Sequence, residues 1–139
     1  MSAVAHRLVD EVPTPAVHHD LSVAVGWGDA FWWDAMAASL AGSVCGVVAY
    51  DEADRPVAMG RVVGDGAFYF YVQDVVVHPD HQGRGLGRQV VQRLLAQVSE
   101  RAPGHCFVGL FATPQARALY ESEGFAQDSM TGLWKVLRD

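Results

Sequence analysis

Residues 73–88 read QDVVVHPDHQGRGLGR and join a valine-rich run to a loop with glycine at every second position. The apolar residues that follow recur at helical spacing, so a buried strand is expected to lead through this loop into a helix. The first turn of a helix has unpaired backbone N–H groups and the positive end of the helix dipole. We therefore predict that this junction binds an anion such as a phosphate.

Other interpretations of the loop fit less well. A plain turn is disfavoured because three glycines would weaken the start of the helix. A P-loop needs the pattern GxxxxGK[ST], and no lysine follows here. The dinucleotide fingerprint needs GxGxxG and an acidic residue after a second strand, whereas the spacing here is GxGxG and the next apolar run ends in Phe111-Ala112-Thr113.

Upstream of residue 73, β-rich runs separated by turn residues predict an antiparallel meander. The expected strands are residues 4–9, 43–50, 57–63 and 67–77. A helix is expected within residues 13–25, followed by a loop. Asp29 is expected to cap a second helix that reaches residue 40.

Downstream of the loop, the spacing of apolar residues predicts a helix from Gly87 to Val98. The continuous apolar run 106–111 is typical of a strand covered on both faces. Thr113 is expected to cap a helix that ends at Gly124, and residues 133–137 are expected to form a last strand. The chain is therefore predicted to be one α/β domain, residues 1–139, with a mixed sheet and about four helices.

The composition indicates which partners to expect. Half of the 139 residues are hydrophobic and 19% are charged, which is typical of a packed domain. The net charge is −6, and the ten basic residues are spread out apart from a modest group at Arg84, Arg88 and Arg93. This pattern argues against nucleic-acid binding. An anion must then be held by local geometry rather than by the overall field.

The cysteines and the apolar runs indicate the compartment. Cys45 and Cys106 both lie in predicted strands and are expected to be reduced. No Cys/His group has zinc spacing, so no metal site is predicted. The start of the chain has no signal-peptide pattern, and no apolar run reaches the ~20 residues of a membrane span. We therefore expect a cytoplasmic protein that does not enter a membrane.

Two motifs in this order resemble those of the GNAT acetyltransferases. QGRGLG, residues 82–87, is similar to that superfamily's Q/R-x-x-G-x-G/A pyrophosphate motif, and DVVVHP, residues 74–79, resembles the strand that leads into it. ARALYESEGF, residues 116–125, resembles its A-x-x-L-Y-x-x-x-G-F segment. The predicted elements cover nearly the whole chain, and the pair of motifs is far more specific than either alone.

The resemblance implies a GNAT fold and acetyl-CoA as the cofactor. The valines of the strand would pair with the pantetheine arm through their backbone, and a bulge in this strand would open the cleft. Many relatives carry asparagine where this chain has Thr113. The cofactor-binding residues implied are Val75, Val76, Val77, Gln82, Gly83, Arg84, Gly85, Leu86, Gly87, Arg88, Thr113 and Tyr120.

The resemblance also implies direct acetyl transfer to an amine. Tyr120 is the candidate general acid for the leaving thiolate, and the alternative is a core aromatic. Asp74 is the candidate base and a substrate contact, with His78 second, and the alternative for Asp74 is a polar group satisfied at a strand bulge. Trp27, between two glycines, is the candidate wall of the acceptor pocket. At least one of the tryptophans 32 and 33 is expected to be core.

Three functions stay open at this point. The first is acetylation of a primary amine on a small molecule, and the second is acetylation of a protein lysine or N-terminus. The third, from another class, is a binding module that senses acetyl-CoA without turnover. The resemblance also leaves a homodimer open, because relatives often pair through their C-terminal strands.

Overall fold

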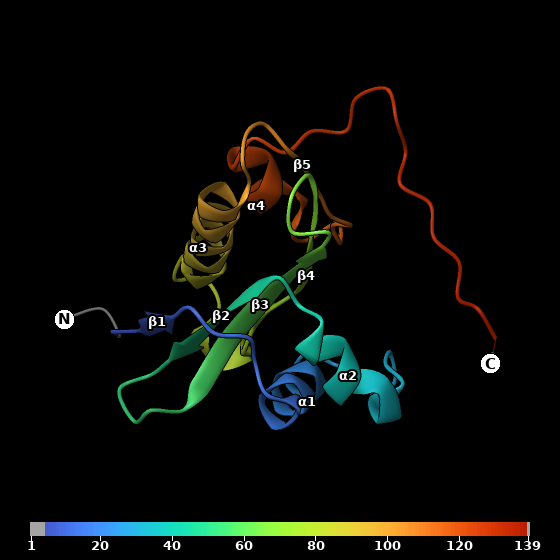
Figure 1. Ribbon diagram of the computed structural model, residues 1–139. Helices are drawn as coiled ribbons and strands as arrows, with labels where there is room; N and C mark the ends of the chain where they lie inside the picture. The colour runs from blue at the N-terminus through green and yellow to red at the C-terminus, as the bar shows by residue number, and fades with distance from the viewer. Residues whose placement is uncertain (1–4, 139) are drawn as a thin grey trace.

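A mixed β-sheet lies at the centre of the computed structural model, which describes residues 5–138 (Figure 1). Neighbouring strands in the sheet follow the order of the sequence, and only the last pair is parallel. The strands of the described chain are β1 (Arg7–Val9), β2 (Cys45–Tyr50), β3 (Pro56–Gly64), β4 (Tyr69–Val77) and β5 (Phe107–Gly109). The antiparallel meander predicted for residues 43–50, 57–63 and 67–77 is confirmed as β2 to β4. The first strand predicted at residues 4–9 is present as β1, and residue 4 lies outside the described residues.

Helices cover both faces of the sheet (Figure 1). On one face lie α1 (Pro15–Ala24), a 3-10 turn (Trp33–Ala35) and α2 (Met36–Ala41). On the other lies α3 (Leu86–Arg101), and α4 (Arg117–Ser122) follows β5. A second 3-10 turn (Pro79–His81) precedes the glycine loop. Among residues 5–138, no helix is long and apolar enough to cross a bilayer.

The larger core cluster lies between α3 and the sheet. The helix contributes Leu86, Val90, Leu94 and Val98, which share one face at intervals of four residues. Strands β2 to β4 meet them with buried valines, alanines and Phe70. A smaller cluster between α1 and the sheet contains Leu21, Met59 and Val76. Burial of this apolar surface is the main force that holds α3 against the strands that carry the site.

A bulge in β4 changes which side chains face each layer. Arg61 pairs with Gln73 and Met59 pairs with Val76, so two residues of β4 lie opposite one residue of β3. Asp74 takes a left-handed conformation there, with φ 57°. Phe70 and Val72 before the bulge pack on the α3 cluster, and so do Val75 and Val77 after it. The bulge expected from the resemblance is therefore present.

Two helix starts differ from the sequence predictions. Asp29 does not cap the second helix, which begins at Met36 after a 3-10 turn whose N-cap is Trp32. The indole N–H of Trp33 donates to the Gly28 carbonyl at 2.8 Å and holds this segment as a loop. Thr113 does not cap α4 either. Its carbonyl accepts from the Ala116 N–H at 3.0 Å, which makes a turn before the helix begins.

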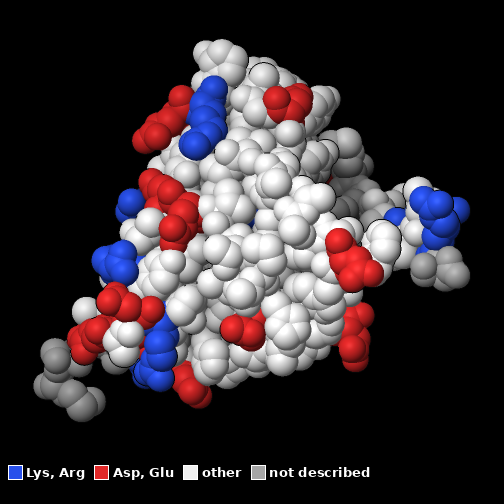
Figure 2. Space-filling model, turned by 60° about the horizontal axis from the view of Figure 1, so that its bottom comes forward, with Lys and Arg blue, Asp and Glu red and all other residues white. Residues whose placement is uncertain are grey.

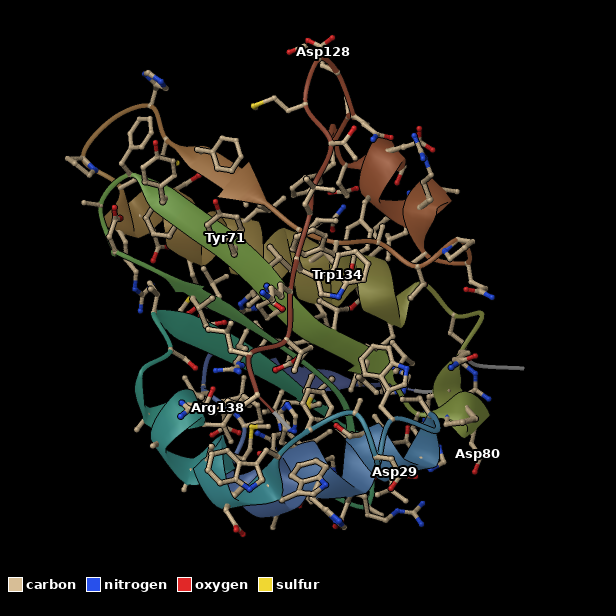
Figure 3. All side chains as sticks on the ribbon, turned by 90° about the vertical axis from the view of Figure 1, so that its right-hand side faces the viewer. Asp29, Tyr71, Asp80, Asp128, Trp134 and Arg138 are labelled. Carbon is tan, nitrogen blue, oxygen red and sulfur yellow. The ribbon has the colours of Figure 1, made fainter. Side chains whose placement is uncertain are left out.

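The two strands predicted near the C-terminus also differ. β5 has three residues and is not covered on both faces, because the smaller α1 cluster does not reach it and Phe107 and Phe111 are partly exposed. Residues 133–137 make no ladder in the described structure. The segment runs apart from the sheet in Figure 1 and passes in front of it in Figure 3, where Trp134 is labelled. Leu133 is 86% exposed, and Trp134 contacts Phe111 with ring centroids 5.5 Å apart.

Candidate active site

A cleft opens where β4 and β5 separate. The two strands pair only between Tyr69–Tyr71 and Phe107–Gly109, so in the described structure the β5 side of β4 is unpaired from Val72 onward. A cavity of about 200 Å³ lies at this point. It is lined by Trp27, Val72, Gln73, Asp74, Val75, Phe111, Thr113, Ala116 and Tyr120. The cleft therefore brings together residues from the loop after α1, from β4 and from the segment that contains α4.

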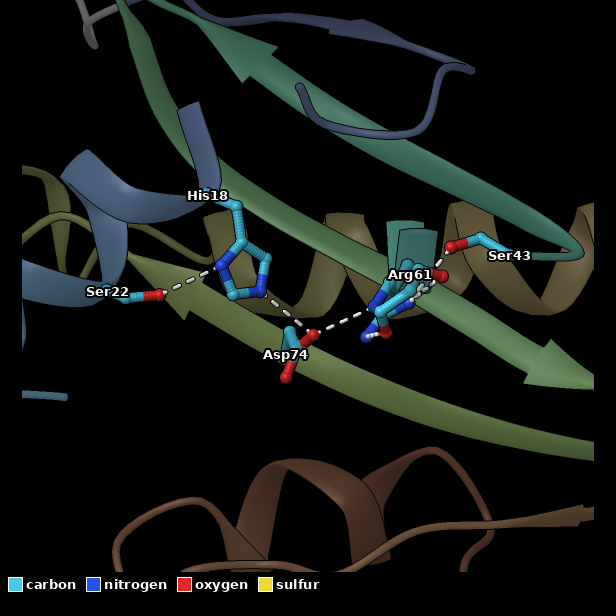
Figure 4. Close-up of polar contacts among 6 residues, drawn as sticks. His18, Ser22, Ser43, Arg61 and Asp74 are labelled. Atoms are coloured by element: carbon cyan, nitrogen blue, oxygen red, sulfur yellow. Dashed lines mark hydrogen bonds and ion pairs between the residues drawn. The ribbon is translucent and has the colours of Figure 1, made fainter. Parts of the chain in front are cut away.

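Asp74 is held at the bulge by two side chains from other elements (Figure 4). Its Oδ2 accepts from Nε2 of His18 on α1 at 3.0 Å and from Nε of Arg61 on β3 at 2.8 Å. The other oxygen points away from both partners, toward α4 (Figure 4). Asp74 thus presents one carboxylate oxygen to the cavity while the second is fully engaged.

The protonation state of Asp74 follows from these contacts. Burial alone would raise its pKa, but the hydrogen bonds from His18 and Arg61 and the Arg61 charge outweigh burial and lower the pKa below its usual value. Asp74 is therefore a carboxylate at neutral pH. Such a group suits contact with an amine or ammonium. Its pKa is too low for it to remove the proton of a free alkylammonium.

Tyr120 enters the cavity from the last turn of α4. The helix ends in a Schellman motif, in which Phe125 N–H donates to the Tyr120 carbonyl at 3.0 Å and Gly124 N–H to the Glu121 carbonyl at 3.1 Å. Gly124 has φ 91°, which this motif requires, and the Phe125 ring lies 5.9 Å from the Tyr120 ring. The glycine and phenylalanine of the second motif therefore fix the position of Tyr120.

Burial also defines the charge state of Tyr120. The side chain is 8% exposed, and desolvation raises the pKa of its hydroxyl above the usual value of 10.0. The phenol is therefore protonated over the whole physiological range and can donate a proton. Asp74 and Tyr120 line the same cavity, one negatively charged and one neutral.

The glycine loop is exposed and leaves open space at the start of α3. Gly83 and Gly85 have φ 79° and 77°, a left-handed conformation in which side chains are strained. No described atom lies within 4 Å of where a Cβ would sit at either position. The first intrahelical bond is donated by Gln89 N–H, and no described side chain caps the helix. Leu86, Gly87 and Arg88 therefore direct free N–H groups toward this open space, which fits a pyrophosphate.

The side chains around the glycine loop differ in their contacts and in their exposure to solvent. Gln82 donates its amide to the Val77 carbonyl at 2.9 Å, so it closes the loop onto β4. Arg88 is tied to α4, where it donates to Ser122 Oγ at 3.0 Å. Leu86 is buried in the core, and only its backbone is available. Arg84 is exposed and is the cation best placed to meet an incoming phosphate.

The other predicted site residues are placed as follows. Trp27 lines the cavity and packs on the α1 cluster, and Thr113 lines the cavity opposite Asp74's strand. His78 is not among the lining residues, and its Nδ1 accepts from Asp80 N–H at 3.1 Å as a local cap. Trp32 is 75% exposed, whereas Trp33 is half-buried against His18 and His19.

Charged side chains are mixed on the face in Figure 2. Along its left side, blue basic groups alternate with red acidic groups, and uncharged residues occupy most of the centre. This face therefore carries no continuous basic surface of the kind that binds polyanions.

Two residues of this site are not predicted from the sequence. Neither His18 nor Arg61 stands among the candidate site residues. Both are buried and both bond to Asp74. A usable signal existed for His18, because His18, Leu21 and Ser22 share one face of the predicted helix.

With this geometry established, comparison with known proteins identifies the relatives of the chain. Residues 42–127 match the model of a protein family described as Acetyltransferase (GNAT) domain. The structure of a protein of unknown function and probable acetyltransferase from meticillin-resistant Staphylococcus aureus superposes with a TM-score of 0.85. That pair is 24% identical and covers 96% of this chain and 100% of the other. The shared fold is therefore clear.

Two curated relatives come from plants. Serotonin N-acetyltransferase 2, chloroplastic, from Oryza sativa subsp. japonica is 46% identical over 80 residues, which is 58% of this chain and 39% of that protein. GCN5-related N-acetyltransferase 1, chloroplastic, from Arabidopsis thaliana is 38% identical over 81 residues, 58% of this chain and 40% of that protein. The chain thus spans about two fifths of the length of these relatives.

These relatives correct one prediction. A cytoplasmic location was expected, but both plant proteins carry the word chloroplastic in their names. The expectation is therefore contradicted. Free cysteines indicate a reducing environment, but more than one compartment of a cell is reducing. Cysteine content therefore does not distinguish between these compartments.

Proposed function

This chain belongs to the GNAT family of acetyltransferases, and we propose that it transfers the acetyl group of acetyl-CoA to the primary amine of a small molecule. One observation carries the proposal. Asp74 and Tyr120, a carboxylate and a protonated phenol, face one cavity at the point where β4 separates from β5. β4 then continues directly into the glycine loop, so a donor that spans the strand edge and the loop would end at this cavity.

The donor side fits a coenzyme A molecule. When bound, acetyl-CoA supplies an activated acetyl thioester. The free N–H groups of the first turn of α3 and the exposed Arg84 would hold its pyrophosphate. The edge of β4 from Val75 to Val77, which has no strand partner on the β5 side, would hold the pantetheine arm as an added strand beside the bond from Gln82 to the Val77 carbonyl. Thr113, on the far side of the cavity, offers a hydroxyl in place of the longer asparagine of many relatives.

On the acceptor side, Asp74 is proposed to accept a hydrogen bond from the amine through Oδ1. A free alkylammonium has a pKa of about 10.4 and keeps its proton against such a carboxylate. Once the nitrogen has bonded to the acetyl carbon it is far more acidic, and Asp74 Oδ1 can then take the proton. The amine must therefore reach the cavity in its neutral form, and the rate is expected to rise with pH toward the pKa of the amine.

Tyr120 is proposed to give a proton to the departing sulfur. Its raised pKa keeps the phenol protonated, so a proton is available at the cavity when the thiolate departs. Two proton transfers at opposite ends of one small cavity complete the reaction, and neither needs a metal.

The walls of the cavity suggest the class of acceptor. Trp27 and Phe111 provide aromatic surface next to the Asp74 carboxylate, which suits an amine with an aromatic or apolar body. The rice relative is named for serotonin, an amine of that kind. A volume of about 200 Å³ is small for a peptide and supports a small molecule over a protein lysine or N-terminus.

The test is consumption of the acetyl thioester with a panel of amines. The panel holds arylalkylamines, short alkylamines, lysine-containing peptides and peptides with free N-termini, and thiol release is followed. We expect turnover with an arylalkylamine and much slower turnover with peptides. Turnover with peptides alone would favour the protein acetyltransferase. Acetyl-CoA binding by calorimetry without any turnover would instead indicate a sensor module.

A further inference from the structure

A buried histidine stands behind the candidate active site and has no role in the proposed chemistry. His18 on α1 has no exposed surface. Its Nε2 lies 3.0 Å from Asp74 Oδ2, the oxygen that also receives Arg61 Nε (Figure 4). A polar side chain is buried at a cost unless its hydrogen bonds are made, so a histidine kept in this position calls for an explanation.

The hydrogen bonds define the tautomer of His18. Asp74 is ionised and can only accept, so His18 donates from Nε2. In the neutral imidazole Nδ1 is then the acceptor, and the Ser22 hydroxyl, one helical turn further along α1, lies 3.3 Å from it and can donate. Both ring nitrogens are therefore engaged.

Aromatic rings prevent His18 from turning. The rings of Phe31 and Trp33 lie edge-on to the imidazole, with centroids 5.1 and 5.7 Å away. Trp33 is itself held by its bond to the Gly28 carbonyl. The donor of His18 is thus fixed in direction by the same loop that carries Trp27 to the cavity.

Arg61 completes the support of Asp74 from the opposite side. Its guanidinium donates to the Ser39 carbonyl, Ser39 Oγ and Ser43 Oγ as well as to Asp74. Asp74 itself stands in a left-handed conformation that favours glycine. Two donors on Oδ2 therefore hold a strained residue so that Oδ1 faces the cavity.

We infer that His18 is a positioning residue for acetyl transfer, which holds Asp74 so that its free oxygen meets the acceptor amine. The inference rests on the proposed function of the cavity. His18 does not contact the amine. It acts through Asp74, so its loss should affect catalysis. The loss of a histidine that only packs against the sheet would affect stability alone.

Two substitutions separate these roles. His18→Leu keeps an apolar side chain of similar size and removes the donor, whereas His18→Gln keeps a donor in a comparable place. We expect His18→Leu to lower kcat/KM for the amine by about tenfold or more, with the acetyl-CoA affinity unchanged. His18→Gln should recover most of the loss. His19→Leu is the matched control, because His19 is the next residue on α1 and its side chain is 52% exposed.

The pH profile gives a readout that packing alone would not move. The groups that face Asp74 are His18 from α1 and Arg61 from β3, with Tyr120 of α4 across the cavity. Loss of the His18 bond removes one of the causes that lower the Asp74 pKa, so the pKa of Asp74 should rise. Asp74 adds a second limb to kcat/KM at low pH, below the rise that the amine sets. That limb should then move to higher pH in His18→Leu and stay in place in His18→Gln.

A measurement without turnover separates this inference from the proposed function. Carboxyl ¹³C NMR follows the titration of Asp74 in the wild type and in His18→Leu, and we expect a higher midpoint in the variant. If the wild type acetylates no amine, the proposed function fails while this titration still tests the His18 contact. An unchanged midpoint together with unchanged kcat/KM in a folded His18→Leu protein would overturn the inference.

The wild-type protein provides the remaining check if the His18 variants do not fold. Imidazole ¹⁵N NMR at neutral pH should show a proton of His18 on Nε2. A proton on Nδ1 alone would remove the donor to Asp74 and with it the positioning role.

Discussion

The two sides of the cleft are built in different ways. On the acceptor side, Asp74 is held by side chains 56 and 13 positions away in the sequence. On the donor side, residues 83–88 form one continuous run, and the groups that face the ligand are backbone N–H groups of an uncapped helix. A buried network couples the acceptor side to the stability of the fold, while the donor side depends on the backbone conformation of two glycines.

This contrast predicts where substitutions act. Changes in the Asp74 network should lower stability and activity together, because an unpaired charge would be left in the interior. Changes in the loop should lower cofactor affinity in a protein that stays folded, because the loop is exposed and packs on little. Tyr120 lies between these cases, since its ring packs on Phe125 while its hydroxyl is the proposed proton donor.

The largest effect is expected from Arg61→Leu. The change leaves the Asp74 carboxylate without its buried cation and should lower the free energy of unfolding by about 3–5 kcal/mol. Urea denaturation measures it. The double variant Arg61→Leu/Asp74→Asn should recover part of the loss, because it removes both charges and asparagine tolerates the left-handed backbone.

The matched control is Arg7→Leu, which breaks the exposed ion pair between Arg7 and Asp54. Exposed pairs contribute little to stability, so its unfolding midpoint should match that of the wild type. Equal losses for Arg7→Leu and Arg61→Leu would contradict the view that the acceptor side is coupled to the fold.

Much of the fold could be predicted from sequence because its signals are local. The meander follows from β-rich runs between turn residues, and α3 follows from apolar residues at intervals of three and four. Residues 133–137 show the limit of such signals. Their apolar pattern favours a strand, but a strand also needs a partner edge, and in the described structure this segment runs apart from the sheet (Figure 1).

The candidate site also has one part that contiguous sequence motifs predict and another part that only the fold brings together. The donor loop was predicted as a unit because its residues are contiguous. The Tyr120 segment was predicted from its resemblance to a GNAT motif, whose glycine and phenylalanine form the C-cap of α4 in the structure. His18 and Arg61 could not be assigned to Asp74, because only the fold brings α1, β3 and the bulge of β4 together.

The next largest effect concerns chemistry at Tyr120. Tyr120→Phe keeps the ring contact with Phe125 and removes the proton donor, so kcat should fall about a hundredfold. Acetyl-CoA affinity and the unfolding midpoint should change little. Steady-state kinetics with the best amine of the panel and calorimetry measure the two quantities.

Tyr71→Phe provides the control for Tyr120, since Tyr71 is an exposed tyrosine on β4 outside the cavity lining. The pH dependence adds a second check. Because burial raises the Tyr120 pKa above 10.0, the acid form persists as pH rises, and wild-type kcat should not fall between pH 7 and about 10. A decline with a midpoint near pH 8 would exclude Tyr120 as the proton donor.

The smallest effect is expected from a substitution in the donor loop. A matched pair of glycine variants separates the strain on the backbone from the loss of contact with the ligand. Gly85→Ala places a Cβ in the open space that the phosphate would enter and strains a backbone with φ 77°, so acetyl-CoA affinity should fall about tenfold. Gly66→Ala is a close match, with φ 78° and no described atom within 4 Å of its Cβ position, but it lies in the β3–β4 turn. Both variants should lose similar stability, and only Gly85→Ala should lose affinity by calorimetry. Equal affinities would mean that the loop is a turn and that the donor binds elsewhere on the cleft.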